Sequence, residues 1–216
     1  MRDKNLDDKS LYIRQTFTKE YAELGEAFIN KEKYLIQISA EEGRLLGLFI
    51  KMNNIKTIVE IGTLYGYSSI LMAKALPSDG HIYTIEKSNE YADIAAQNFA
   101  DFKVDDKITL MRGNGLDQLK KLEANSPLDM IFIDADKASY TDYLDWAELH
   151  IRQRGLIIAD NTLLFDTIYL ESPPKWLSEK SWYNMKDFNT RLANVKKYYS
   201  MLIPTKEDMT IALKLI

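Results

Sequence analysis

Four short apolar segments, each ending in an acidic residue, constrain the fold of this chain more than any other feature. Each is rich in β-branched or other large apolar residues, and stretches with helical spacing separate them. Such runs are typical of parallel strands that are buried on both faces of a sheet. Ligands bind such sheets just beyond the carboxyl ends of the strands, so we expect the acids to gather along one edge. The segments are 57–60, 82–86, 130–134 and 156–160, and they end at Glu60, Glu86, Asp134 and Asp160.

The order of the predicted elements indicates an α/β fold. From residue 57 onward strands and helices alternate, which favours a doubly wound, Rossmann-like sheet in a single domain, residues 1–216. Helical spacing over 8–30 and 40–52 precedes the alternation, and a polar turn near the end predicts an antiparallel hairpin of 198–203 with 209–214. Residues 161–197 have room for a loop over the site and one helix. The alternating strands are expected over 57–61, 81–86, 107–111, 129–134 and 155–160, with Gly155 as a turn signal, and the helices over 68–76, 89–102, 115–122 and 139–151.

Composition limits the chemistry that the chain can carry out. There is no cysteine, which excludes disulfides, thiolate nucleophiles and sulfur-ligated metals. The two histidines, His81 and His150, are far apart in the sequence, so a metal would be held by oxygen atoms and would be Mg²⁺, Mn²⁺ or Ca²⁺. The net charge of −4 gives no support to non-specific binding of nucleic acid.

Nothing in the sequence predicts a membrane protein or a secreted one. The first five residues include three charged ones, unlike a signal peptide, and no uncharged stretch approaches the ~20 residues of a membrane span. We therefore expect a cytoplasmic protein.

A glycine-containing loop follows the first predicted strand. Gly62 and Gly66 are separated by three residues and allow a tight turn with close approach to a ligand, although an ordinary turn would also accept a glycine. The spacing is not the G-x-G-x-x-G of dinucleotide sites, and Glu60 would repel a diphosphate. S-adenosylmethionine, which has a positive centre and no phosphate, fits better. Glu86 lies 24 residues after Gly62 (86 − 62), close to the ~20-residue interval of an acid that binds ribose, though it could also be a simple cap.

Acids and an asparagine at two neighbouring strand ends predict a metal site. Asp134, Asp160 and Asn161 would supply three hard oxygen ligands, which suits a chelating substrate with vicinal oxygens. A bound Mg²⁺ would make a hydroxyl easier to deprotonate, and Lys137 is close enough in sequence to take the proton. The alternatives are that an acid here caps a helix and that Lys137 forms a surface ion pair with Asp136.

Taken together, these motifs resemble those of the cation-dependent O-methyltransferases, which include the caffeoyl-CoA and catechol O-methyltransferases. The resemblance extends from about Ser39 to the C-terminus, with the glycine and metal motifs in the same order and at similar intervals. It is carried by residues 60–68, 134–137, 160–162, 40–43 and 106–108, and by Tyr140 and Tyr143.

This resemblance implies a seven-stranded sheet with an antiparallel last strand, extra N-terminal helices and a homodimer. It implies S-adenosylmethionine as methyl donor, a divalent cation held by Asp134, Asp160 and Asn161, and Lys137 with Asp134 as the catalytic residues. The contacts that it implies for the cofactor are Ile38, Glu60, Gly62, Thr63, Ser68, Glu86, Gly115, Asp134, Asp136 and Tyr143.

The methyl acceptor remains open, with a catechol-like small molecule as the first hypothesis. Leu164 and Phe165 replace a tryptophan and an asparagine of the plant enzymes, and residues 206–208 replace a Gly-Asp-Gly turn, so the acceptor need not be a CoA thioester. A second hypothesis is 5-hydroxyuridine of tRNA, with residues 196–199, Lys175 and Trp176 as RNA contacts. A third is a non-catalytic module that binds S-adenosylmethionine.

Overall fold

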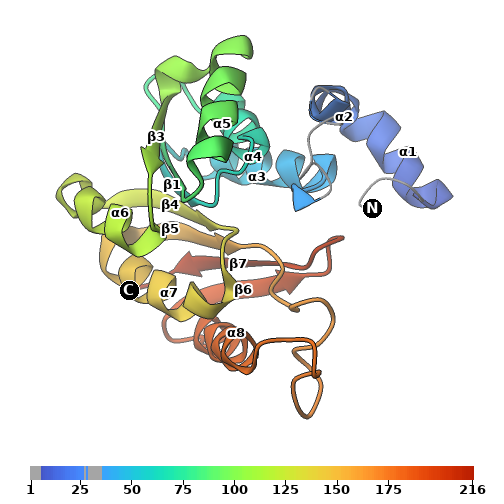
Figure 1. Cartoon of the computed structure of the whole chain (residues 1–216), viewed down its shortest axis with the longest axis vertical. Helices are drawn as coiled ribbons and strands as arrows, with labels where there is room; N and C mark the ends of the chain where they lie inside the picture. Colours follow the sequence, from blue (N-terminus) through green and yellow to red (C-terminus); the bar gives the residue numbers. More distant parts are fainter. Residues whose placement is uncertain (1–5, 27, 29–35) are drawn as a thin grey trace. The chain divides into compact units, whose positions relative to one another are not determined.

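The strands form one seven-stranded sheet in a computed structural model that describes residues 6–26, 28 and 36–216 (Figure 1). Their order is β3-β2-β1-β4-β5-β7-β6, and β7 is antiparallel to both of its neighbours. This arrangement confirms the predicted doubly wound α/β sheet with its antiparallel last strand. The chain divides into two compact units, of which one comprises Met1–Lys56 and Thr63–Arg112 and the other Thr57–Gly62 and Gly113–Ile216.

The first unit packs helices against each other and against a pair of parallel strands. α3 packs on α4, and α5 contacts both β2 and β3 (Figure 1). Ser39 and Glu42 form a capping box that fixes the start of α3. The elements are α1 (Asp8–Phe17), α2 (Lys19–Glu26), α3 (Ala40–Met52), α4 (Tyr67–Ala75), β2 (His81–Glu86), α5 (Asn89–Asp101), η2 (Asp105–Lys107) and β3 (Ile108–Arg112).

The helical stretch predicted over 8–30 is broken at Thr18, which ends α1 with a φ of −129°. Its hydroxyl contacts the carbonyl oxygen of Arg14 at 3.2 Å and a carboxylate oxygen of Glu41 at 3.0 Å, so the break is fixed by tertiary contacts. Residues 27, 29 and 30 of that prediction lie outside the described residues.

The second unit contains five strands, and its three parallel strands have buried apolar residues opposite one another. β1, β4 and β5 are parallel, with Val59 opposite Ile131 and Ile131 opposite Ile157, and all three residues are fully buried. α7 and α8 lie side by side in this unit (Figure 1). Its elements are β1 (Thr57–Ile61), α6 (Gly115–Leu122), η3 (Glu123–Asn125), β4 (Leu128–Ile133), η4 (Lys137–Ser139), α7 (Tyr140–His150), β5 (Ile151–Ala159), α8 (Glu179–Leu192), β6 (Tyr198–Ile203) and β7 (Met209–Lys214).

The start of β5 corrects one detail of the prediction. The strand begins at Ile151 rather than at 155, and Gly155 lies inside it. The pairing with β4 is irregular between Leu128 and Met130, and a Cβ at Gly155 would lie only 2.7 Å from the carbonyl oxygen of Asp129. Gly155 therefore allows close approach at a strand irregularity and does not mark a turn.

Candidate active site at the strand ends

Lys137 connects the ends of β4 and β5. It lies in the short η4 turn, and its side chain is only 14% exposed. Its Nζ atom lies 3.3 Å from Oδ1 of Asp134, 2.6 Å from the hydroxyl of Tyr140 and 3.5 Å from the carbonyl oxygen of Asp160. The predicted surface pair with Asp136 is therefore replaced by a set of contacts to Asp134, Tyr140 and Asp160.

Tyr140 supports this arrangement from the first turn of α7. The residue is fully buried, and its hydroxyl donates to the carbonyl oxygen of Asp160 at 2.9 Å. Burial raises the pKa of the Tyr140 phenol well above its usual value, and the nearby charges of Asp134 and Asp160 raise it further. The phenol consequently keeps its proton and can accept from Lys137 while it donates to Asp160.

The end of β5 lies beside the end of β4. Ile133 pairs with Ala159, and the backbone N–H of Asp160 donates to the carbonyl oxygen of Ile133 at 2.9 Å. The side chains of Asp134 and Asp160 thus leave neighbouring parallel strands at the same level. Asp160 is fully buried, a costly position for a carboxylate unless its charge is compensated.

Asn161 follows in a left-handed conformation with a φ of 57°, which asparagine tolerates better than most residues. It is 8% exposed, and its Nδ2 atom donates to Oε2 of Glu207 at 3.1 Å. The next residue, Thr162, makes three hydrogen bonds to two neighbours, because it donates twice to the Asp208 carbonyl and its own carbonyl accepts from Asn189.

The donor set formed by Asp134, Asp160 and Asn161 fits a hard divalent cation. All three come from the ends of β4 and β5 and offer carboxylate or amide oxygens, the ligands that Mg²⁺, Mn²⁺ and Ca²⁺ prefer. No group of three or more acidic, histidine or cysteine side chains within metal-binding range occurs in the described residues. The predicted ligands are two acids and one amide, so they are not a group of three such side chains.

Gly62 is required by the close packing of β1 against β4. Its φ is 98°, and a Cβ at this position would overlap the carbonyl oxygen of Asp134. Glu60 lies one residue before the end of β1, opposite Phe132, and is fully buried. Of the four strand-end acids, Glu60 is thus recessed into its strand, whereas Asp134 and Asp160 follow theirs.

Asp136 is held by two hydroxyl groups. Tyr143 donates to Oδ2 at 2.8 Å and Ser139 donates to Oδ1 at 2.7 Å. Burial, followed by the hydrogen bond to Asp136, raises the pKa of the Tyr143 phenol, so it remains a donor. A Cβ at Gly115 would lie 2.9 Å from the Tyr143 hydroxyl, so the predicted residues Gly115, Asp136 and Tyr143 lie together.

In the first unit, the turn before α4 is built around Glu86. The carboxylate of Glu86 accepts from the backbone N–H groups of Leu64 at 2.8 Å and Ser88 at 2.7 Å. The hydroxyls of Thr63 and Thr84 are 2.6 Å apart. Gly66, the N-cap residue of α4, follows in a left-handed conformation with a φ of 85°.

The last two predicted cofactor contacts also belong to the first unit. Ile38 is 5% exposed and precedes Ser39, the N-cap of α3. Ser68 lies in the first turn of α4.

Two residues of the second unit have a structural role at the site that sequence reasoning missed. Tyr140 belongs to a sequence motif that assigns it no role, yet it binds both Lys137 and Asp160. Glu207 belongs to a turn that differs from the family's Gly-Asp-Gly motif, yet it binds Asn161. The spacing of Tyr140, three residues after Lys137, could have indicated the first contact, whereas no local signal indicates the second.

Comparison with known proteins gives a consistent result. A family model described as O-methyltransferase matches residues 11–215. A catechol O-methyltransferase of Niastella koreensis is 40% identical over 130 residues, which span 59% of this chain and 59% of that relative. Tricin synthase 1 of Oryza sativa subsp. japonica is 31% identical over 190 residues, 84% of this chain and 75% of that relative.

Solved structures extend the similarity to the whole chain. The O-methyltransferase TomG of Streptomyces achromogenes, solved in complex with SAM, matches with a TM-score of 0.85 and 28% identity over 100% of both chains. An O-methyltransferase of Bacillus cereus, solved with SAH, has a TM-score of 0.80 and 26% identity over 94% of this chain and 96% of that one.

Proposed function

The chain belongs to the O-methyltransferase family, and on that premise we propose that it transfers a methyl group from S-adenosylmethionine to an oxygen of a metal-chelating, catechol-like small molecule. The observation that carries the proposal is the position of Lys137, bonded to Asp134 and to the carbonyl of Asp160 at the ends of two neighbouring strands. An oxygen-rich site with an amine at its side suits an acceptor that must lose a hydroxyl proton.

The residues proposed for the cofactor suit a ligand with hydroxyl groups and a positive charge. S-adenosylmethionine supplies a methyl group on a sulfonium, and moving it to an oxygen depends mainly on positioning. The loop that follows Glu60, residues 62–68, lacks the lysine of a phosphate-binding P-loop. In one unit the proposed contacts are Ile38, Thr63, Ser68 and Glu86, and in the other Glu60, Gly62, Gly115, Asp134, Asp136 and Tyr143.

Asp134, Asp160 and Asn161 are the proposed ligands of the cation, which would be Mg²⁺, Mn²⁺ or Ca²⁺. A divalent cation is a Lewis acid that makes a neighbouring hydroxyl easier to deprotonate. Two observations support these ligands: the carboxylate of Asp160 is fully buried, where a cation would compensate its charge, and the Asn161 amide is held by a hydrogen bond to Glu207.

Lys137 is the proposed proton acceptor. In its amine form, Nζ has a lone pair for the proton, and the resulting ammonium has three acceptors within 3.5 Å: Asp134, Tyr140 and the carbonyl of Asp160. These contacts stabilise the protonated product and hold the side chain in place between the two strand ends.

The tRNA hypothesis receives less support. Within residues 196–199, Lys197 pairs with Glu148 at 3.3 Å, and the buried Tyr198 donates to the same carboxylate at 2.6 Å. Two of the four residues are thus held against the protein, which favours a small-molecule acceptor. No helix in the described part of the chain is both long and apolar enough to span a bilayer. A homodimer and a cytoplasmic location remain predictions from the resemblance and the composition.

A methyl-transfer screen tests this function. Catechols, flavonoids and bulk tRNA are incubated with S-adenosylmethionine, with EDTA or with added Mg²⁺ or Mn²⁺, and methylated products are measured by mass spectrometry. We expect a catechol to be methylated only with metal, and Asp160→Asn to lower turnover by about 100-fold or more with little change in cofactor affinity. Asp166→Asn, an exposed acid six residues further on, is the matched control. Equal activity with and without EDTA would contradict metal dependence.

A further inference from the structure

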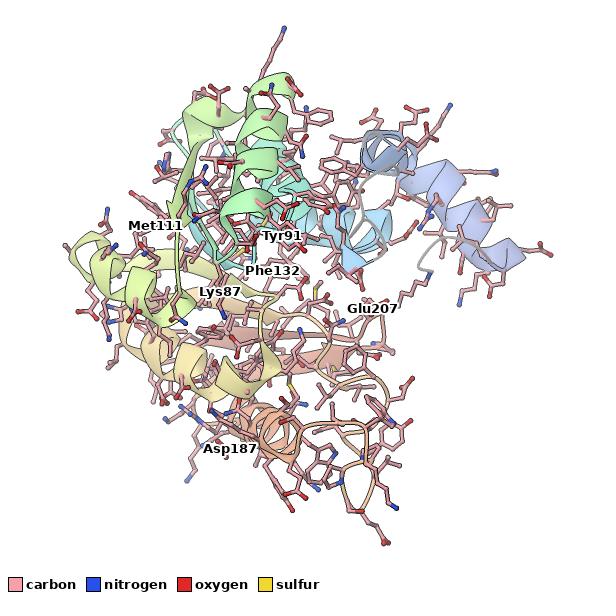
Figure 2. The ribbon with its side chains drawn as sticks, in the orientation of Figure 1. Lys87, Tyr91, Met111, Phe132, Asp187 and Glu207 are labelled. Carbon is pink, nitrogen blue, oxygen red and sulfur yellow. The ribbon has the colours of Figure 1, made fainter. Side chains whose placement is uncertain are left out.

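Glu207 lies in the turn between β6 and β7, far in the sequence from the strand ends that carry the proposed metal ligands (Figure 2). Its Oε2 atom nevertheless accepts a hydrogen bond from Nδ2 of Asn161 at 3.1 Å. We propose that Glu207 is a positioning residue that orients Asn161 toward the divalent cation and thereby sets the affinity of the site. The inference rests on the metal-dependent function proposed for this chain.

The hydrogen bond determines which end of the Asn161 amide is available. A carboxylate can only accept hydrogen bonds, so the NH₂ end of the amide must face Glu207. Oδ1, the only atom of that side chain able to bind a cation, then points away from Glu207. With the left-handed backbone of Asn161, this contact fixes both the direction and the rotation of the amide.

The turn that carries Glu207 is itself tied to the segment that carries Asn161. The backbone N–H and the hydroxyl of Thr162 both donate to the carbonyl oxygen of Asp208, each at 2.8 Å. The hydroxyl of Thr210 donates to that of Thr162 at 2.8 Å. These bonds flank the Asn161–Glu207 contact on its C-terminal side, so the acid is held next to its partner.

Glu207 acts through Asn161 and does not join the ligands. Asp134, Asp160 and Glu207 do not form a cluster of three acids within metal-binding range in the described part of the chain. The hydrogen bond from Asn161 to Glu207 holds the amide in the orientation that presents the oxygen to the cation. Residues that hydrogen-bond to a metal ligand in this way typically contribute 10–100-fold to metal affinity.

The test measures metal binding directly. Mn²⁺ is titrated into full-length protein saturated with S-adenosylhomocysteine, and the free ion is followed by electron paramagnetic resonance. We expect Glu207→Ala to weaken Mn²⁺ binding by about 10–100-fold. Glu207→Gln, whose amide oxygen can still accept from Asn161, should stay within about threefold of the wild type, because the bond is retained. Lys206→Ala, at the exposed neighbouring position, is the matched control and should bind as the wild type does.

A second measurement separates positioning from a general structural role. The affinity for S-adenosylhomocysteine, measured by calorimetry, should be the same in all variants, whereas a disturbed fold would lower both affinities. If Glu207→Ala does not fold, Glu207→Ser replaces it, since serine suits a turn and is too short to reach Asn161.

The possible failures are distinguishable. Equal Mn²⁺ affinity in wild type and Glu207→Ala, or a Gln variant as weak as the Ala variant, would overturn the role of Glu207 and leave the proposed function intact. Absence of Mn²⁺ binding by the wild-type protein would instead overturn the proposed metal site.

Discussion

Two regions of the molecule, the turn before α4 and the ends of β4 and β5, carry predicted site residues in different ways. At the turn, Glu86 accepts from the backbone N–H groups of Leu64 and Ser88, so one side chain organises a backbone. At the strand ends, the side chains of Lys137, Tyr140, Asn161 and Glu207 bind one another or the strand ends. The first region depends on backbone conformation, and the second depends on groups brought together by the tertiary fold.

This difference predicts how each region responds to mutation. A change in the turn should disturb the backbone and therefore the stability of the protein. A change at the strand ends should remove a chemical group while the sheet beneath it, held by β1, β4 and β5, persists. The strand ends should consequently show large losses of activity with small losses of stability, and the turn the reverse.

The largest effect is expected for Lys137→Met, which keeps the length of the side chain and removes the amine. Turnover should fall by about 100- to 10,000-fold, the usual contribution of a positioned acid–base group, because the acceptor proton has no recipient. Initial rates with a catechol acceptor and thermal unfolding are measured together. Lys120→Met, on the exposed face of α6, is the control. A Lys137→Met enzyme with near-normal turnover would show that another group takes the proton.

An intermediate effect is expected for Gly66→Ala in the turn. The φ of 85° disfavours alanine, and its Cβ would overlap the buried ring of Phe99. We expect the free energy of unfolding to fall by about 2–3 kcal/mol, which corresponds to a melting temperature lower by about 5–10 °C.

The control for this change is Gly25→Ala in α2. A Cβ there would lie 3.5 Å from the Tyr67 hydroxyl, an ordinary contact, and alanine favours a helix. Its stability should stay equal to that of the wild type or rise by up to about 1 kcal/mol. If both variants unfold at the same temperature, the left-handed turn is not a constraint.

The same difference explains how much could be predicted from the sequence. Apolar runs such as 130–134 and glycines such as Gly62 and Gly66 carry local signals, so the strands, the hairpin and the turn were predicted nearly in place. The levels of Asp134 and Asp160 follow from the parallel sheet alone. The contact of Glu207 with Asn161 depends on how the hairpin of β6 and β7 packs against the end of β5. No periodic pattern in the sequence predicts that contact. The prediction of a turn at Gly155 is wrong for a similar reason, because the irregular pairing of β5 with β4 has no local signal in the sequence.

The smallest effect is expected for Glu86→Gln, at a residue that has both a structural role and a proposed binding role. Glutamine keeps one acceptor oxygen but presents NH₂ to one of the two backbone N–H donors, so stability should fall by about 1 kcal/mol. If Glu86 also binds the ribose hydroxyls, S-adenosylmethionine affinity measured by calorimetry should fall by about tenfold, equivalent to about 1.4 kcal/mol. Glu90→Gln, exposed in the first turn of α5, serves as the control and should change neither quantity by more than about 0.5 kcal/mol. A loss of stability without a loss of affinity would make Glu86 a backbone support only, and the ribose contact would have to come from another residue.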